Sequence, residues 1–247
     1  MRYLGTGSAH AHWRIDTDAG RFVWRAVADP GHTPGASEAA EAAALTAIAG
    51  QAWAPRLITH LPGQGWLFHH APGHPPDPAT LDAHQRAALI EALLACWSLP
   101  CHLPPRDYSA LVCDYARRAQ PWAGTDRAHD HSCPTSALVD RLLAGCANWQ
   151  PTDFRFTHHD LHPGNLLLAG RHWTLLDWEY AGLGNPWFDA AALDAMLGLG
   201  GAERARIEAA LGPPSQPGGW AGLRAWHDDL ARLWARARKP EAWRFQV

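Results

Sequence analysis

Alternating apolar and polar positions in the first quarter of the chain predict short β-strands. Residues 13–17 and 21–25 carry this pattern, and the intervening Asp18-Ala19-Gly20 is typical of a tight hairpin turn. Two further strands are predicted at residues 54–59 and 65–70. The beginning of the chain is therefore expected to form a small β-rich unit.

Longer stretches of the chain have the periodicity of helices. The alanine-rich residues 36–50 predict a helix, with Ser37 as its N-cap and Gly50 at its end. Another helix is predicted over residues 81–95, where apolar residues recur every three or four positions and Thr80 serves as the cap. Further helices are predicted at residues 108–120, 135–147, 188–197 and 223–238, with a polar loop at 121–134.

These elements predict an α+β chain with two lobes. Residues 71–78 are rich in proline and glycine and separate the strand patterns from the helical ones. We therefore predict a short N-terminal lobe over residues 1–70, a lobe connection at 71–78 and a larger helical C-terminal lobe over 79–247.

Composition and charge exclude several classes of protein. The 247 residues carry a net charge of −3 and only 18% charged residues, which argues against a basic surface for nucleic acid. No apolar run is long enough for a membrane span, and residues 1–7 lack the apolar core of a signal peptide. The five cysteines are scattered without a Cys-x-x-Cys pair. Reduced thiols in a cytoplasmic protein fit this pattern best.

The most informative chemistry lies in residues 158–165, His-His-Asp-Leu-His-Pro-Gly-Asn, which precede Asp177. The pattern His-x-Asp-x₄-Asn with a later acidic residue is that of a kinase catalytic loop. Asp160 is predicted to accept the proton of a substrate hydroxyl. His158 is the second catalytic-loop candidate, as a scaffold that bonds to the backbone near Asp177. Asn165 and Asp177 offer oxygen ligands for the Mg²⁺ that bridges nucleotide phosphates.

A predicted hairpin explains how two residues twelve positions apart reach one ion. Leu166-Leu167-Leu168 and residues 173–176 flank a turn at Ala169-Gly170-Arg171. Because a hairpin brings its ends together, Asn165 and Asp177 are expected to meet. Asp189, at the start of the following helix, is expected to brace the catalytic loop by bonding to its backbone.

At these residues the chain resembles a known family. The catalytic-loop motif, residues 175–181 (Leu-Leu-Asp-Trp-Glu-Tyr-Ala) and residues 184–189 (Gly-Asn-Pro-Trp-Phe-Asp) resemble the aminoglycoside phosphotransferase/choline kinase superfamily. The Asp-Trp-Glu-Tyr-Ala segment is most similar to the bacterial thiamine kinase and choline kinase branch. The resemblance spans nearly the whole chain. It implies a bilobal protein kinase-like fold, ATP as co-substrate and Mg²⁺ as cofactor.

The resemblance also implies nucleotide-binding residues in the N-terminal lobe. Arg25 stands where kinases place a lysine for the phosphates, as in the thiamine kinase-like branch, and guanidinium binds phosphate well. Glu41 is expected to pair with Arg25, although Glu38 is an alternative. The remaining nucleotide-binding candidates are Gly5, Gly7 and Ser8 in a small-residue loop over the phosphates, and Phe68 and His70 beside the adenine.

The predicted activity is transfer of the ATP γ-phosphoryl group to an alcohol of a small cationic metabolite, best matched by thiamine. A carboxylate beside aromatic rings suits a cation, so Trp178, Glu179 and Tyr180, with Trp226 near them, are the acceptor-binding candidates. Choline, ethanolamine and amino sugars or aminoglycosides are alternative acceptors. A nucleotide-binding pseudokinase and a histidine-rich metallohydrolase are alternative classes. No nucleic-acid or membrane partner is expected, and no oligomeric state is predicted.

Overall fold

The computed structural model describes residues 1–6, 10–27, 36–119 and 135–237. Two compact units are present. One contains Met1–Pro105 and Phe154–Gly212, and the other contains Arg106–Asp153 and Pro213–Val247. The lobe division predicted at residues 71–78 remains a prediction.

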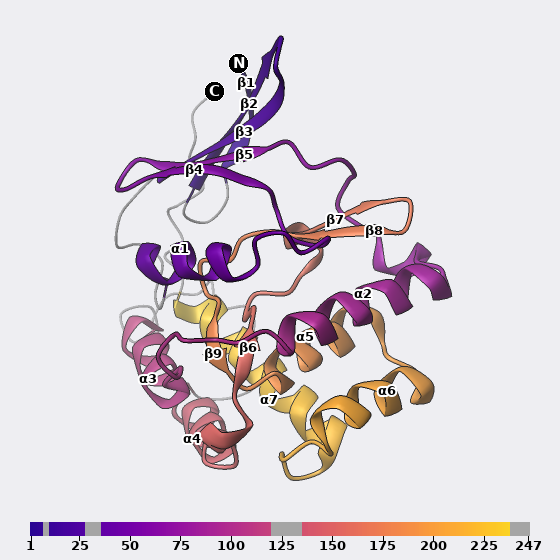
Figure 1. The fold of residues 1–247 in the computed structure, drawn as a ribbon. Coiled ribbons are helices and arrows are strands. Elements are labelled where there is room, and N and C mark those ends of the chain that lie inside the picture. The colour runs from indigo at the N-terminus through magenta and orange to yellow at the C-terminus, as the bar shows by residue number, and fades with distance from the viewer. Residues whose placement is uncertain (7–9, 28–35, 120–134, 238–247) are drawn as a thin grey trace. The chain divides into compact units, whose positions relative to one another are not determined.

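A five-stranded antiparallel sheet occupies the N-terminal part of the first unit, at the top of Figure 1. Its order is β1-β2-β3-β5-β4. The central hairpin joins β2 to β3 through Asp18-Ala19, with Thr17 opposite Gly20 as the turn pattern predicted. The strands are β1 (Arg2–Thr6), β2 (His10–Thr17), β3 (Gly20–Val27), β4 (Leu57–Leu61) and β5 (Gly65–His69).

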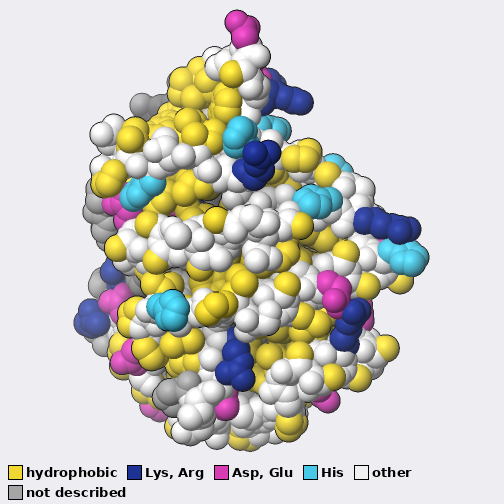
Figure 2. Space-filling view, in the orientation of Figure 1, with side chains coloured by type: hydrophobic (Ala, Val, Ile, Leu, Met, Phe, Trp, Pro, Cys, Tyr) yellow, Lys and Arg dark blue, Asp and Glu magenta, His cyan; other side chains and the backbone are white. Residues whose placement is uncertain are grey.

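Two departures from the predicted strands concern the sheet edges. Residues 2–6 form β1, although no strand was predicted there. The strand predicted at 54–59 begins later, as β4, because Ala54 and Pro55 lie in the bend that follows α1. The exposed large hydrophobic residues lie mainly on these two edge strands: Tyr3, Leu4, Ile58 and Leu61. Figure 2 shows hydrophobic side chains on the surface of the molecule.

The helix predicted over residues 36–50 is α1 (Glu38–Ala47). Ser37 caps it, as predicted, because its hydroxyl accepts a hydrogen bond from the Ala40 N–H. The helix ends earlier than predicted, with Ile48 as the C-cap, and Gly50 lies in the turn beyond at a φ of 85°. The next helix, α2 (Ala83–Trp97), is capped by Asp82 rather than Thr80, since Asp82 and Gln85 form a reciprocal capping box.

The rest of the first unit contains a second β-hairpin. The predicted pair of strands is present as β7 (Leu166–Ala169) and β8 (His172–Leu175), with Leu166 opposite Leu175. A short antiparallel pair, β6 (Arg155–Thr157) and β9 (Gly182–Gly184), lies on either side of this hairpin in sequence. Helices α5 (Trp187–Leu197) and α6 (Gly201–Leu211) complete the unit, with short 3₁₀ turns η1 (Pro78–Thr80) and η4 (Pro163–Asn165).

The second unit packs three helices around aromatic side chains. These helices are α3 (Tyr108–Ala119), α4 (Thr135–Cys146) and α7 (Gly219–Ala237), with the short turn η3 (Pro151–Asp153). The centroid of the Trp149 ring lies 4.4 Å from that of Trp226, with the two rings tilted by 59°, and both rings contact Tyr108. The loop predicted at 121–134 lies outside the described residues.

The architecture confirms the predicted α+β class, with an antiparallel sheet in the N-terminal region and helices in the C-terminal region. None of the described helices combines the length and apolar character that crossing a membrane requires.

Candidate active site

The catalytic-loop candidates lie between β6 and β7. His158 is fully buried, and its ring bonds the loop in two directions. Its Nε2 lies 2.8 Å from the Leu176 carbonyl oxygen, and its Nδ1 accepts from the Asp160 N–H at 3.2 Å. These contacts require the neutral ring with the proton on Nε2. Burial lowers the pKa of His158 to about 4, in agreement with that state. The predicted scaffold contact near Asp177 is present.

Asp160 is held by the asparagine five residues later. The Asn165 side-chain Nδ2 donates to the Asp160 carbonyl oxygen at 2.9 Å and to its Oδ2 at 2.8 Å. The carboxylate side chain keeps 35% of its surface exposed. Burial of the rest, together with the nearby charge of Asp177, raises the pKa of Asp160 to about 6. The loop therefore presents a fixed, accessible carboxylate.

Asp189, on the first turn of α5, anchors the catalytic loop through its backbone, as predicted. Its side chain is fully buried, and its two oxygens accept hydrogen bonds from the His158 and His159 N–H groups at 2.9 Å. The Trp97 indole Nε1 donates to the same carboxylate at 3.1 Å. One buried carboxylate therefore fixes the backbone directly before Asp160.

A buried cation links the N-terminal sheet to the end of β8. Arg25 on β3 is 4% exposed. Its Nη1 donates to Asp177 Oδ1 at 2.7 Å, and its Nη2 bonds to Glu41 Oε1. The guanidinium also lies over the rings of Trp66 and Phe68, 5.7 and 5.9 Å from their centroids. In this structure Arg25 engages two carboxylates, so its contact with phosphate remains a prediction.

The alternative between the two helix glutamates is decided by their contacts. Glu41 is buried and pairs with Arg25, whereas Glu38 bonds to His60 at 2.6 Å and to the Gly63 N–H at 2.8 Å. Burial raises the pKa of Glu41, and the charge of Arg25 opposes that shift. The pair expected from the resemblance is therefore Arg25–Glu41.

We expect Glu41→Gln to lower the free energy of unfolding by about 1–3 kcal/mol, because it removes one of the two anions that neutralise a buried guanidinium. Glu38→Gln is the matched control on the same helix. Its side chain is 39% exposed, so the expected cost is below about 1 kcal/mol. Urea unfolding measures both values, and equal losses for the two variants would contradict the assignment.

Two residues at the site have left-handed backbone conformations that side chains disfavour. Among the described residues other than glycine, positive φ angles occur at His159 (67°) and Asp177 (59°). Such conformations typically cost 1–3 kcal/mol and concentrate at functional sites. Here His159 directly precedes Asp160, and the conformation of Asp177 sets the direction of its own carboxylate.

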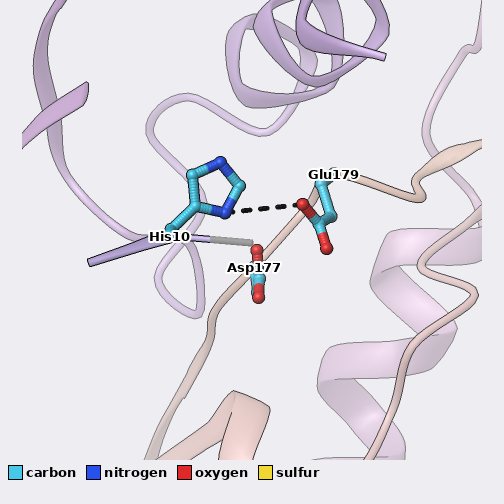
Figure 3. A group of neighbouring side chains, drawn as sticks. All are labelled: His10, Asp177 and Glu179. Carbon is cyan, nitrogen blue, oxygen red and sulfur yellow. Dashed lines mark ion pairs between the residues drawn. The ribbon is translucent and has the colours of Figure 1, made fainter. Parts of the chain in front are cut away.

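Sequence reasoning missed the role of His10. At the start of β2, its Nδ1 lies 3.5 Å from Glu179 Oε2, with Asp177 beside them (Figure 3). Burial, followed by the charge of Arg25, lowers the pKa of His10 to about 4. Burial and the Asp177 charge raise the pKa of Glu179 to about 8. Strand alternation offered a signal, because His12 lies opposite Arg25 and His10 shares the face of His12.

Of the other nucleotide-binding candidates, the structure describes Gly5, Phe68 and His70. Gly5 lies in β1 rather than in a loop, because it pairs with His12 of β2. Gly7 and Ser8 lie outside the described residues. Phe68 is half-buried in β5, beneath Arg25. The backbone N–H of His70 donates to the Arg21 carbonyl at 2.9 Å and so extends the pairing of β5 with β3. The nucleotide contacts of Phe68 and His70 remain predictions.

The acceptor candidates need one correction. Trp178 has no exposed surface and packs against Trp53, Phe156 and His158, with its Nε1 donating to the Leu175 carbonyl. It is therefore a core residue and cannot contact an acceptor here.

The other acceptor candidates are Glu179, Tyr180 and Trp226. Glu179 is buried and faces His10, and Tyr180 is half-buried. Trp226 belongs to the aromatic core of the second unit, where its Nε1 donates to the Leu142 carbonyl. Because Trp178 is buried, residues 178–180 do not present an aromatic cage for a cation.

Solved structures share this fold. A choline kinase from Streptococcus pneumoniae matches with a TM-score of 0.72 at 12% identity, covering 100% of this chain and 89% of that one. A spectinomycin phosphotransferase, solved with ADP and spectinomycin, matches with a TM-score of 0.67 at 13% identity, covering 96% and 80%. At such identities the likeness establishes the kinase-like fold.

Sequence comparison identifies the family. The model of the phosphotransferase enzyme family APH matches residues 2–226, and the chain belongs to this family. A thiamine kinase from Salmonella typhimurium is 29% identical over 183 residues, which are 70% of this chain and 59% of that protein. The chain thus spans less than two thirds of the length of this curated relative.

Proposed function

We propose that this protein is a small-molecule kinase that transfers the γ-phosphoryl group of ATP to an alcohol. The observation that carries the proposal is the arrangement of Asp160, Asn165 and Asp177 around a loop anchored by Asp189. A pseudokinase would not need an accessible carboxylate oriented in this way, and family membership supports the same class.

In the proposed reaction, Asp160 orients the acceptor hydroxyl and takes its proton as the alcohol oxygen attacks the γ-phosphorus. The bond between that phosphorus and the bridging oxygen of ADP breaks, and ADP leaves. The hydrogen bonds from Asn165 keep the Asp160 carboxylate in one orientation. The carboxylate therefore loses little conformational entropy when the transition state forms. His158 and Asp189 act as positioning residues because they bond the loop backbone and touch no reactant.

The donor atoms at the site fit a hard divalent cation. Asp177 provides carboxylate oxygens, and the Asn165 amide keeps Oδ1 for a ligand because its Nδ2 donates to Asp160. These two residues are adjacent in the fold, since the Leu176 N–H donates to the Asn165 carbonyl at 2.8 Å. When bound, Mg²⁺ neutralises the phosphates of the nucleotide.

Thiamine is the acceptor that we propose, on the strength of the 29% identity to the Salmonella enzyme over 70% of the chain. It carries a primary alcohol and a cationic ring. Because Trp178 is buried, it cannot provide the aromatic contact that would favour a cationic acceptor. The structure therefore gives no separate support for a cation. Similarity to the relative, and not the lining of the site, therefore carries this part of the proposal.

The test is ADP release from Mg-ATP in separate reactions with thiamine, choline, ethanolamine, amino sugars and aminoglycosides. We expect release with thiamine and a phosphorylated product by mass spectrometry, both abolished by chelation and restored by added Mg²⁺. Release with a different compound would retain the kinase and replace the acceptor. Tight ATP binding without release in every reaction would instead support a pseudokinase.

A further inference from the structure

The first unit contains a cavity between α2, the turn of the β7–β8 hairpin and the segment after α1. Its volume is about 360 Å³, within the roughly 300–1,000 Å³ typical of small-molecule sites. Figure 1 shows α2 beside this hairpin, and the Trp173 indole Nε1 joins the two by donating to the Gln85 carbonyl at 2.9 Å. The lining contains none of the catalytic or metal-binding candidates. Most of it is formed by Trp53, Ala88, Ala92, Ala95, Arg171 and Trp173.

Alanine methyl groups and indole rings make up the apolar part of the lining. Ala88, Ala92 and Ala95 are spaced by four and three residues, so they lie on one face of α2. A methyl group fills little space, and longer side chains at these positions would close the cavity. Trp53 and Trp173 are 7% and 3% exposed. Indole rings pack well against other aromatic rings, so this lining favours a planar aromatic ligand.

The Trp53 indole N–H has no acceptor among the described residues, although the residue is almost completely buried. A buried indole N–H normally finds a hydrogen-bond partner. This one is not sealed off by protein atoms, in contrast to the Trp149 Nε1 in the second unit. Because Trp53 lines the cavity, its N–H is available to an oxygen acceptor on a ligand there.

The charged residues at the cavity favour an anion. Arg171, in the exposed turn between β7 and β8, forms no ion pair with any residue that the structure describes. Asp82 feels its charge, but the Asp82 carboxylate accepts its hydrogen bond from the Gln85 N–H. Glu91, the acidic residue of the lining, is paired with Arg206 of α6. A carboxylate in the cavity would therefore meet a guanidinium whose charge is not already neutralised by an ion pair.

We propose that this cavity binds a small aromatic carboxylate, with its ring against the alanine face of α2 and its carboxylate paired with Arg171. The Trp53 N–H is a further donor to a ligand oxygen. The cavity is distinct from the proposed active site, so binding there does not depend on the kinase function.

Trp53 also connects the cavity to the catalytic segment. Its carbonyl oxygen accepts from the Leu175 N–H at 2.9 Å, and its ring centroid lies 5.7 Å from that of Trp178. Leu175 and Trp178 lie on either side of Asp177 in sequence. A ligand that fixes Trp53 would therefore also restrict the segment that carries Asp177, and we expect it to raise the affinity for Mg-ATP. This consequence rests on the proposed function.

The test is calorimetric titration of the full-length protein with 2-naphthoate and with its neutral counterpart, 2-naphthylmethanol. We expect one site that binds the carboxylate about 3–10-fold more tightly than the alcohol. Arg171→Gln should remove this preference and leave the affinity for the alcohol unchanged. Arg21→Gln is the matched control, because Arg21 is an exposed arginine at a hairpin turn of the sheet. Absence of naphthoate binding, or equal naphthoate affinity in the wild type and Arg171→Gln, would overturn the proposal.

A second variant places the ligand in the cavity. Ala88→Leu fills part of the space with a side chain that suits a helix, so we expect both naphthalene compounds to bind at least about 10-fold more weakly. Ala83→Leu is the matched control, because Ala83 is exposed on the same helix and does not line the cavity. Unchanged naphthoate affinity in a folded Ala88→Leu protein would overturn the assignment to this cavity.

The link to the nucleotide is tested by titrating Mg-ATP with and without saturating 2-naphthoate. We expect the Mg-ATP affinity of the wild type to rise about 2-fold or more, and that of Ala88→Leu to stay constant. An unchanged affinity in the wild type would refute the link and leave the binding site in place. Absence of Mg-ATP binding would contradict the kinase function, whereas naphthoate binding is measured independently of it.

Discussion

Replacing Asp160 by asparagine is expected to lower kcat by about 10²–10⁴-fold, the usual contribution of a positioned proton acceptor. The amide cannot take the hydroxyl proton, although it nearly matches the carboxylate in shape. The contact with Asn165 would then join two amides, one of which can turn its oxygen toward the other. We therefore expect the fold to persist, with a change in unfolding free energy of less than about 2 kcal/mol.

The measurement for Asp160→Asn is the initial rate of ADP formation at saturating ATP and acceptor, with urea unfolding on the same preparation. Asp16→Asn is the matched control, because it makes the same chemical change at an exposed carboxylate that pairs with Arg14 on the sheet. The control should retain the wild-type rate. A wild-type rate in Asp160→Asn would remove Asp160 from the mechanism.

The largest loss of stability is expected for Asp189→Ala. This change leaves the His158 and His159 N–H groups and the Trp97 indole N–H buried without their acceptor. Each unsatisfied donor costs about 1–3 kcal/mol, and the costs are not fully additive, so a loss of about 3–5 kcal/mol is expected. Many domains do not fold stably after a loss of that size.

Asp189→Asn provides the graded comparison. It keeps one oxygen acceptor, so we expect a loss of about 1–3 kcal/mol, together with a lower kcat because the loop before Asp160 is held less firmly. Asp194→Asn, on the same helix, is the control for removal of a buried charge, because the Asp194 carboxylate accepts hydrogen bonds from the Leu199 N–H and the Arg204 guanidinium. Asp189→Ala with an unfolding free energy within about 0.5 kcal/mol of the wild type would refute the bracing role.

Local patterns predicted the hairpins, the cap of α1 and the meeting of Asn165 with Asp177, since each depends on residues close in sequence. The predicted cap of α2, Thr80, was wrong. The reciprocal bonds of Asp82 with Gln85 outweighed a lone threonine.

The remaining errors concern contacts between distant segments. The aromatic character of Trp178 fits a binding surface and a core equally well, and only the packing of Trp53 and Phe156 around it separates the two. Strand alternation could place His10 on the face of Arg25, but its contacts with Asp177 and Glu179 could not be predicted, because these partners lie far along the chain. The fold class and the catalytic-loop geometry were thus accessible from the sequence, whereas the surroundings of each side chain were not.

The ion pair between Arg25 and Asp177 also bears on how the chain is made. The two residues are separated by 152 positions, so at typical synthesis rates of about 5–20 residues per second Asp177 is added roughly 8–30 seconds after Arg25. During that interval the nascent sheet can form its hairpins and pair Arg25 with Glu41, but the anion from the catalytic segment does not yet exist. The N-terminal sheet should therefore reach its final stability only after most of the chain has left the ribosome.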